Sequence, residues 1–421
     1  MSSSSSSKAQ RPVDSSPISE ISDAPWRDTV SPQALTLLEL ASLTDGLTAL
    51  GASAPRHEVD VVVIGGGVTG LSAAQAVSAA GLRTLLLDAA PRLGAGASGR
   101  NAGILSAGAN APLSELAPGS PVAALWPETT RILLDLLAEA EKPGSLLNAR
   151  RTGALNIATS RAAARRIASE ARARHAVGLR ADVWTAAQVA QVTNGRLDTR
   201  EITAALWLPD EGRIHPWTLL ATLARRARKA GAQLVGNARV SAQIADENRR
   251  RHGRWRIAAP GANDQSAMTV YARGLIDATG PTVAPSARLY ALAFMADLPD
   301  DFPLFWDAAP YVYYDYRAGD GRLIVSGGRY GRVGASERDS AYHTRMAEAA
   351  RRWLPELAGQ PPRYAWAVDI DTASDRLPGI QPLAGDAPGL TVVGLGAQGV
   401  LPGIALGRQA GERLAAQLGK R

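Results

Sequence analysis

Three glycines near residue 65 have the spacing of a turn that binds the phosphates of a dinucleotide. Gly65, Gly67 and Gly70 form a GxGxxG pattern. In such turns the first glycine permits a sharp turn, the second lets the backbone approach a pyrophosphate, and the third packs a helix against a strand. Asp88 follows at the distance where an acid accepts hydrogen bonds from both ribose hydroxyls. These residues predict a dinucleotide site; the alternative is a strand–helix–strand unit without a ligand.

The segments around these glycines have the patterns that such a site requires. Residues 61–64 form a β-branched run, typical of a strand buried on both faces. Residues 71–80 predict a helix of small side chains whose N-terminal dipole faces the phosphates. Residues 85–87 predict the second strand, and residues 91–103 a loop of small residues whose backbone can lie close to a flat ring. The alternative for that loop is an ordinary surface connection.

Two later segments complete a set of three glycine-rich turns. Residues 233–240 predict a strand, and residues 273–280 predict a buried strand that returns the chain beneath the first turn. Residues 391–393 predict a strand, 394–399 a glycine turn and 404–418 a closing helix. A helix N-terminus at such a turn can stabilise the electron-rich edge of a reduced flavin.

Composition narrows the class of protein. The chain has 421 residues, 46% of them hydrophobic and 20% charged, as in globular proteins with a large core. It contains no cysteine, which excludes disulfides, thiolate metal sites, cysteine nucleophiles and a flavin tethered through cysteine. No apolar run reaches the roughly 20 residues of a membrane span, and the N-terminus lacks the apolar core of a secretory signal. We therefore expect a cytoplasmic protein without a metal ion.

The net charge of +7 raises the question of a nucleic-acid partner. Only four of the basic residues are lysines, and the arginines are spread through a chain rich in alanine and glycine. Such a bias can arise from base composition, so we expect no nucleic-acid partner.

The three turns in this order resemble those of the D-amino acid oxidase superfamily of flavoproteins, which includes glycine and sarcosine oxidases. The resemblance covers about residues 60–415 and is closest to the γ-glutamylputrescine oxidoreductase-like branch. Members of that branch have a Trp-x-Asp arm before the first motif, as Trp26 and Asp28 do here. They also share a loop like GASGRNAG and a late segment like residues 370–372, followed by Arg-Leu-Pro, here residues 376–378.

The resemblance implies FAD rather than NAD as cofactor. The turn and Asp88 would hold AMP and pyrophosphate, Val240 the adenine through its backbone, and residues 396–400 the isoalloxazine. The residues implied in FAD binding are Gly65, Gly67, Val68, Thr69, Gly70, Asp88, Ser98, Arg100, Asn101, Gly103, Val240, Thr279, Gly280, Gly396, Gln398, Gly399 and Val400.

Three departures from the family pattern bear on the chemistry. Asn101 stands where some members carry a tethering histidine, so FAD should be non-covalent. None of the four lysines lies where sarcosine oxidase-like members use one to speed reaction with oxygen, which leaves oxidase or dehydrogenase activity open. Ile370 stands where glycine oxidase-like members carry an arginine for the substrate carboxylate.

The implied architecture is an α/β fold. It combines a Rossmann-like FAD-binding domain, built from discontinuous segments, with a smaller α+β substrate domain that contains an antiparallel sheet. We expect a disordered serine-rich tail at 1–25, an arm at 26–55, the FAD-binding domain at 56–150, 201–282 and 376–421, and the substrate domain at 151–200 and 283–375.

Amine oxidation by a flavin removes a hydride from the carbon next to nitrogen, and a nearby carboxylate could attract the substrate cation and take its proton. Asp369 and Asp371 would point the same way on a strand; the alternative is a solvated or salt-bridged pair, perhaps with Arg376. Arg329 could bind a distal carboxylate or lie on the surface. His215 could be catalytic or could cap the helix that Pro216 begins.

Residues 302–328 carry two predicted antiparallel strands joined at residues 319–321, and they include four tyrosines. Tyr311 and Tyr313 share one face and Tyr314 and Tyr316 the other, so at most one pair lines a pocket. Tyr313 is our pocket candidate, and core packing is the default for either pair.

These observations predict an FAD-dependent oxidoreductase that converts an amine or amino-acid derivative to an imine, with O2 or another carrier as electron acceptor. One alternative is a tRNA-modifying flavoprotein of the same superfamily. Another is a non-catalytic FAD-binding subunit of a dehydrogenase complex. A dehydrogenase that passes electrons to quinone, docked through the leucine-rich segment 35–50, is also open.

Overall fold

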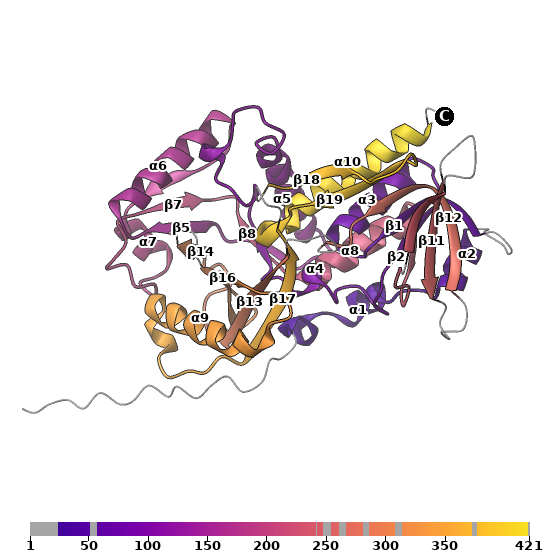
Figure 1. Cartoon of the computed structure of the whole chain (residues 1–421). Helices are drawn as coiled ribbons and strands as arrows, with labels where there is room; N and C mark the ends of the chain where they lie inside the picture. Colours follow the sequence, from indigo (N-terminus) through magenta and orange to yellow (C-terminus); the bar gives the residue numbers. More distant parts are fainter. Residues whose placement is uncertain are drawn as a thin grey trace, which may run out of the picture.

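The computed structural model contains two large sheets at opposite ends of the molecule, with helix α10 reaching from the centre toward the C-terminus (Figure 1). The structure describes residues 24–50, 57–240, 242–246, 254–260, 267–280, 286–307, 314–372 and 377–419. Nearly all of the serine-rich tail predicted at 1–25 therefore lies outside the described residues.

The first sheet carries the glycine motif. Its order is β10-β11-β12-β1-β2-β9, and β19 pairs with β12 and β18. Four of its strand pairs are parallel, and Val61, Val62 and Val63 on central β1 are fully buried, as the β-branched run predicts. The strands are β1 (His57–Ile64), β2 (Thr84–Leu87), β9 (Gln233–Val235), β10 (Ala242–Asp246), β11 (Arg254–Pro260), β12 (Ala267–Asp277), β18 (Gly379–Pro382) and β19 (Gly389–Val393).

Helices cover one face of this sheet. α10 packs along α3, and three glycines of α10 face that contact at four-residue spacing. A Cβ on Gly407 would lie 2.3 Å from the Thr69 carbonyl oxygen, and one on Gly411 would lie 2.7 Å from that of Ala73, so only glycine allows this close approach. The helices of the described chain, including those that pack on the second sheet, are α1 (Pro32–Leu38), α2 (Leu43–Ala49), α3 (Val68–Ala79), α4 (Ala97–Arg100), α5 (Leu125–Ala140), α6 (Arg161–Ala176), α7 (Ala186–Val192), α8 (Pro216–Lys229), α9 (Asp339–Trp353) and α10 (Val400–Gly419).

Two boundaries differ from the sequence prediction for local reasons. α10 begins four residues before the predicted 404, and Pro402 lies in its first turn, where a missing N–H costs no hydrogen bond. β9 ends at Val235, although a strand was predicted to continue to 240, because Asn237 adopts a left-handed conformation with φ of 52°.

The second sheet is antiparallel except between β14 and β5, and its order is β17-β13-β16-β15-β14-β5-β7-β6. The predicted hairpin is present: β15 and β16 are joined at Asp320 and Gly321, both with positive φ. α9 packs on one face of this sheet, and the other face turns toward the first sheet. The strands are β5 (Ala154–Ala158), β6 (Asp182–Trp184), β7 (Ala204–Leu208), β13 (Ser286–Met295), β14 (Leu304–Asp307), β15 (Tyr314–Gly319), β16 (Arg322–Gly331) and β17 (Tyr364–Asp371).

The mixed α/β architecture predicted from the sequence is thus confirmed. A third, small sheet lies between the two large ones, with the order β3 (Ile104–Leu105), β8 (Gly212–Ile214) and β4 (Ala149–Arg151). The 3-10 helices are η1 (Pro25–Thr29), η2 (Leu113–Glu115), η3 (Ser336–Arg338), η4 (Pro355–Leu357) and η5 (Gly396–Gln398). Among the described residues, none of the helices has the length and apolar character needed to cross a membrane.

Candidate functional site

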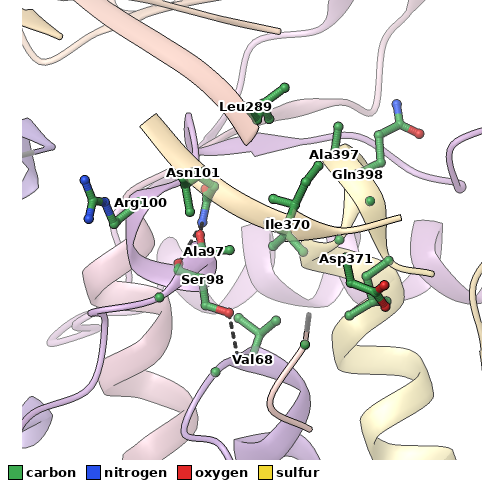
Figure 2. A pocket seen from close by; sticks show the side chains of 18 of the residues that line it. Val68, Ala97, Ser98, Arg100, Asn101, Leu289, Ile370, Asp371, Ala397 and Gln398 are labelled. Carbon is green, nitrogen blue, oxygen red and sulfur yellow. Dashed lines mark hydrogen bonds between the residues drawn. The ribbon is translucent and has the colours of Figure 1, made fainter. Parts of the chain in front are cut away.

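A cavity of about 390 Å³ opens where β1, β2 and β12 reach their carboxyl ends. Ligands of open α/β sheets bind at this edge. The loops after the three strands form one wall, and the second sheet forms the opposite wall with residues of β13 to β17. Figure 2 shows Val68 and Ser98 on one side of the cavity and Ile370 and Gln398 on another.

Most of the residues that the resemblance assigned to the cofactor meet in this cavity. Those that line it are Gly65, Gly67, Val68, Thr69, Asp88, Ser98, Arg100, Asn101, Thr279, Gly280, Gly396, Gln398, Gly399 and Val400. Gly70, Gly103 and Val240 are not part of its lining. Val240 is half-buried and packs beside the apolar cluster on the other face of the first sheet.

The first glycine turn leaves no room for a side chain at Gly65 or at Gly70. Gly65 has φ of 100°, and a Cβ there would lie 2.6 Å from the Ala278 carbonyl oxygen. A Cβ on Gly70 would lie 1.8 Å from the Gly65 carbonyl oxygen. The first turn of α3 therefore faces the cavity with N–H groups that have no partner within the helix, which is the arrangement that binds phosphate.

Asp88 both supports this turn and faces the cavity. Its Oδ2 accepts from the Gly66 amide at 2.7 Å, and its Oδ1 accepts from the Ala90 amide at 2.8 Å. A carboxylate offers about four lone-pair sites, so each oxygen keeps capacity for a ligand hydroxyl. The predicted ribose contact fits this geometry.

The loop around α4 is fixed by hydrogen bonds to both its side chains and its backbone. The Val68 amide donates to the Ser98 hydroxyl at 3.1 Å, and Nδ2 of Asn101 donates to the Ser98 carbonyl at 2.7 Å (Figure 2). The Asn101 Oδ1 accepts from the Gly103 amide at 2.9 Å. Gly103 therefore shapes the loop from outside the cavity.

Three indoles hold three successive carbonyls of this loop. Nε1 of Trp217 donates to Gly99 O at 3.0 Å, Nε1 of Trp366 to Arg100 O at 2.8 Å, and Nε1 of Trp26 to Asn101 O at 3.1 Å. The three residues, which we call the indole clamp, come from α8, β17 and η1. Sequence reasoning missed the clamp because its members lie far apart in the chain. It ties the loop to α8, to the second sheet and to the N-terminal arm.

The C-terminal glycine turn closes another side of the cavity. Gly396 has φ of 55°, and Asn110 crosses the turn: its Nδ2 donates to Leu395 O at 2.9 Å and its Oδ1 accepts from the Gln398 amide at 3.0 Å. The Oδ2 of Asp371 accepts from the Gly394 amide at 2.7 Å. Asn110 was not singled out from the sequence, and no local signal marks it.

The two carboxylates predicted to meet a substrate both line the cavity, and both already have partners. Oδ1 of Asp369 lies 3.3 Å from Nη1 of Arg288, which also pairs with the fully buried Asp339. Asp371 holds the Gly394 amide. The salt-bridged alternative therefore applies to Asp369, with Arg288 as its partner; Arg376 lies outside the described residues.

A third carboxyl in the cavity wall was not predicted. Asp315 on β15 lines the cavity, and the Ser326 hydroxyl of β16 bonds to it. Burial raises the pKa of Asp315 to about 7; the Ser326 hydrogen bond opposes this shift and the nearby Asp307 adds to it. Its neighbour Tyr316 points the other way, is fully buried and stacks on Phe305 at 4.2 Å, so that tyrosine belongs to the core.

Three remaining predicted residues lie away from the cavity or outside the described chain. His215 is fully buried and caps α8 by accepting from the Trp217 amide at Nδ1, while Nε2 lies 3.1 Å from Trp26 O. Burial lowers the pKa of His215 to about 4, so the ring is neutral at physiological pH. Arg329 is exposed and not part of the cavity lining, and Tyr313 lies outside the described residues.

Comparisons with known proteins agree with this geometry. Residues 60–413 match the family model described as DAO, FAD dependent oxidoreductase. Glycine oxidase from Geobacillus kaustophilus is similar in structure, with a TM-score of 0.69 and 19% identity over 86% of this chain and 95% of that one. Iminodiacetate oxidase from Chelativorans sp. BNC1 has a TM-score of 0.66 and 20% identity over 83% and 94%. L-Proline dehydrogenase from P. horikoshii has a TM-score of 0.64 and 16% identity over 86% of this chain and 94% of that one.

A search of the curated proteins gave no match. Members of the matched family bind FAD. The residues present fit that cofactor, because the turn around Gly65 admits no Cβ and Asp88 keeps acceptor capacity toward the cavity. The chain belongs to the DAO family of FAD-dependent oxidoreductases.

Proposed function

We propose that this protein oxidises the CH–NH bond of an amine or amino-acid derivative to an imine, which water then hydrolyses to a carbonyl product. The observation that carries the proposal is that one cavity is lined both by the residues suited to FAD and by the carboxyls of Asp315, Asp369 and Asp371. The three similar structures reported above are named a glycine oxidase, an iminodiacetate oxidase and an L-proline dehydrogenase. Those names agree with oxidation next to nitrogen.

The finer assignment that we propose is the γ-glutamylputrescine oxidoreductase-like branch. Its support is the N-terminal Trp-x-Asp arm. Trp26 holds the Asn101 carbonyl, and Oδ2 of Asp28 accepts from the Tyr364 hydroxyl at 2.7 Å. The arm thus contacts both the loop at the cavity and the second sheet, so it is part of the site's framework.

The residues that we propose for FAD are the turn at 65–70, Asp88, the loop at 97–103, Thr279 and Gly280, and the turn at 396–400. In this proposal FAD is held non-covalently, because Asn101 stands where a histidine tether would be. When bound, FAD supplies the acceptor for a hydride from the substrate carbon.

The protein's own task is to place the substrate and to remove a proton from its nitrogen. An alkylamine with a pKa near that of lysine, about 10.4, is mostly protonated at neutral pH. The nitrogen must be neutral when the adjacent carbon loses its hydride, so a carboxyl in the cavity has to receive that proton. The carboxyl receives the proton from nitrogen and the hydride carries the electron pair away from carbon, so the immediate product is the protonated imine, which water hydrolyses to the carbonyl product and ammonium or an amine.

An anaerobic titration tests the proposal. The purified protein with bound FAD is mixed with polyamines, γ-glutamylated amines, N-methyl amino acids and D-amino acids, and loss of the visible flavin band is recorded. Bleaching by at least one class supports the proposal, and the rate of recovery in air then separates oxidase from dehydrogenase. Absence of bleaching by every class, with FAD still bound, would contradict it.

The same protein distinguishes the alternatives. A tRNA-modifying flavoprotein would bind RNA with an affinity that falls steeply as salt increases. A non-catalytic subunit would retain FAD, bleach with no amine and show no such RNA binding.

A further inference from the structure

Asp315 lies in a row of side chains that crosses the cavity-facing side of the second sheet. It pairs in register with Trp306 on β14 and with Ser326 on β16, and Ser326 pairs with Ala291 on β13. Cross-strand partners point to the same face. All four residues line the cavity, so the row presents one carboxyl, one hydroxyl, an indole and a methyl group to a ligand.

Among the residues that the structure describes, no cation pairs with the Asp315 carboxyl. Its interactions within the described part of the chain are the hydroxyl of Ser326 and the repulsion of Asp307, and no salt bridge there involves it. Burial of a carboxylate is costly unless a cation pairs with it. Asp369 differs in this respect, because Arg288 lies 3.3 Å away.

The charges around the cavity point to the same kind of ligand. The charged residues in its lining are Asp88, Arg100, Asp315, Asp369 and Asp371, as far as the structure describes the chain. The guanidinium of Arg100 is directed away from Ile370 and Gln398 (Figure 2). A substrate carboxylate would therefore meet carboxyls at the second sheet, whereas an ammonium group would meet Asp315 and the indole of Trp306, which can attract a cation through its ring.

We propose that Asp315 binds an ammonium group of the substrate beside Trp306, so that this enzyme acts on alkylamines without a carboxylate next to the reacting carbon. Apolar residues on the same wall, Leu289, Val368 and Ile370, offer contacts for the alkyl chain. The inference rests on the proposed amine oxidation and adds to it the class of substrate and the residue that selects it.

The test compares the wild type with Asp315→Asn at about pH 8, where an ordinary carboxyl and one with a pKa near 7 are both mostly ionised. The readouts are retained FAD, the KM for an alkyl diamine in anaerobic bleaching, and competition by tetramethylammonium. This ion carries a positive charge but no lone pair on nitrogen, so it binds without being oxidised. We expect a KM about 10- to 100-fold higher in the variant, the effect of losing a hydrogen bond to a charged group. Competition by tetramethylammonium should weaken as well.

Asp307→Asn is the matched control. Asp307 does not line the cavity. It follows Trp306 on β14, so its side chain is directed to the opposite face of the sheet, where it bonds to Trp353. This variant also removes one carboxylate from the same sheet. If the position of the carboxylate rather than the net charge of the sheet determines substrate binding, the KM should stay within about twofold of the wild-type value.

An unchanged KM in Asp315→Asn, with FAD retained, would overturn the inference while leaving amine oxidation intact. Faster bleaching of the wild type by α-amino acids than by alkylamines would also overturn it. Bleaching by no amine at all would instead refute the proposed function. Should Asp315→Asn fail to fold, Ser326→Ala provides a second variant, and an unchanged KM and unchanged tetramethylammonium competition there would count against the inference.

Discussion

Replacing Trp26 with phenylalanine tests whether the indole clamp sets the affinity for FAD. Trp26 is 1% exposed, and its indole N–H holds the Asn101 carbonyl at 3.1 Å. Phenylalanine keeps an aromatic ring in the same place but cannot donate. The buried carbonyl would then lack this donor, and the loop that carries Ser98 would lose one of its three indole anchors.

The size of the effect follows from the lost bond. A buried acceptor left without its partner costs about 1–3 kcal/mol. If the bound loop conformation bears this cost, FAD should dissociate about 5- to 150-fold more readily. Trp217→Phe and Trp366→Phe should act in the same direction, because their carbonyls belong to the same loop. The effects of double variants should not add, since neighbouring contacts share one segment.

The assay is the FAD dissociation constant, measured by the rise in flavin fluorescence on dilution, together with thermal unfolding of the apoprotein. Trp184→Phe is the control, because Trp184 stacks on Trp207 at 4.3 Å on β6 at the edge of the second sheet. Weaker FAD binding in Trp26→Phe but not in Trp184→Phe is expected. Equal loss of apoprotein stability in both variants, with an unchanged FAD dissociation constant, would refute the role of the indole clamp in FAD affinity.

Three other substitutions follow from single contacts. Gly70→Ala should abolish FAD binding, seen as a colourless protein, because its Cβ would lie 1.8 Å from the Gly65 carbonyl oxygen. Arg288→Met should lower the free energy of unfolding by about 3–5 kcal/mol in denaturant titrations, because it leaves the buried Asp339 carboxylate without its cation. The pKa of His215 is about 4 in the fold against an ordinary 6.5, so the unfolded chain takes up this proton first and stability falls as pH drops through that window. In His215→Gln, the free energy of unfolding should fall by about 3 kcal/mol less than in the wild type as the pH drops from above 6.5 to below 4. An unchanged pH dependence of stability would contradict the interpretation of His215 as a buried neutral ring.

The part of the site suited to the cofactor could be predicted because each of its turns is local. Gly65 and Gly70 are five residues apart, and both are required by backbone atoms that touch across one turn. Ser98 and Asn101 lie in one short loop and bond to each other. Such contacts leave a spacing in the sequence, and the family resemblance rests on the same spacing.

The opposite wall could not be predicted in the same way, because it depends on register between strands. Asp315 faces the cavity because β15 places it opposite Trp306 and Ser326, which lie on the two neighbouring strands. Asp369 and Asp371 do share one strand, as predicted, but their partners Arg288 and Gly394 come from other segments. The sequence showed which residues had suitable chemistry and not which of them were already paired.

This separation bears on how the enzyme's substrate could change. FAD depends on turns where even a methyl group meets backbone, as at Gly70, so that wall tolerates little variation. The row through Trp306, Asp315, Ser326 and Ala291 belongs to another sheet, and its side chains end in the cavity. A substitution there alters what the cavity binds without moving the turns. A shared fold at 19% identity therefore carries the cofactor site but not the substrate, which has to be derived from the charges of this row.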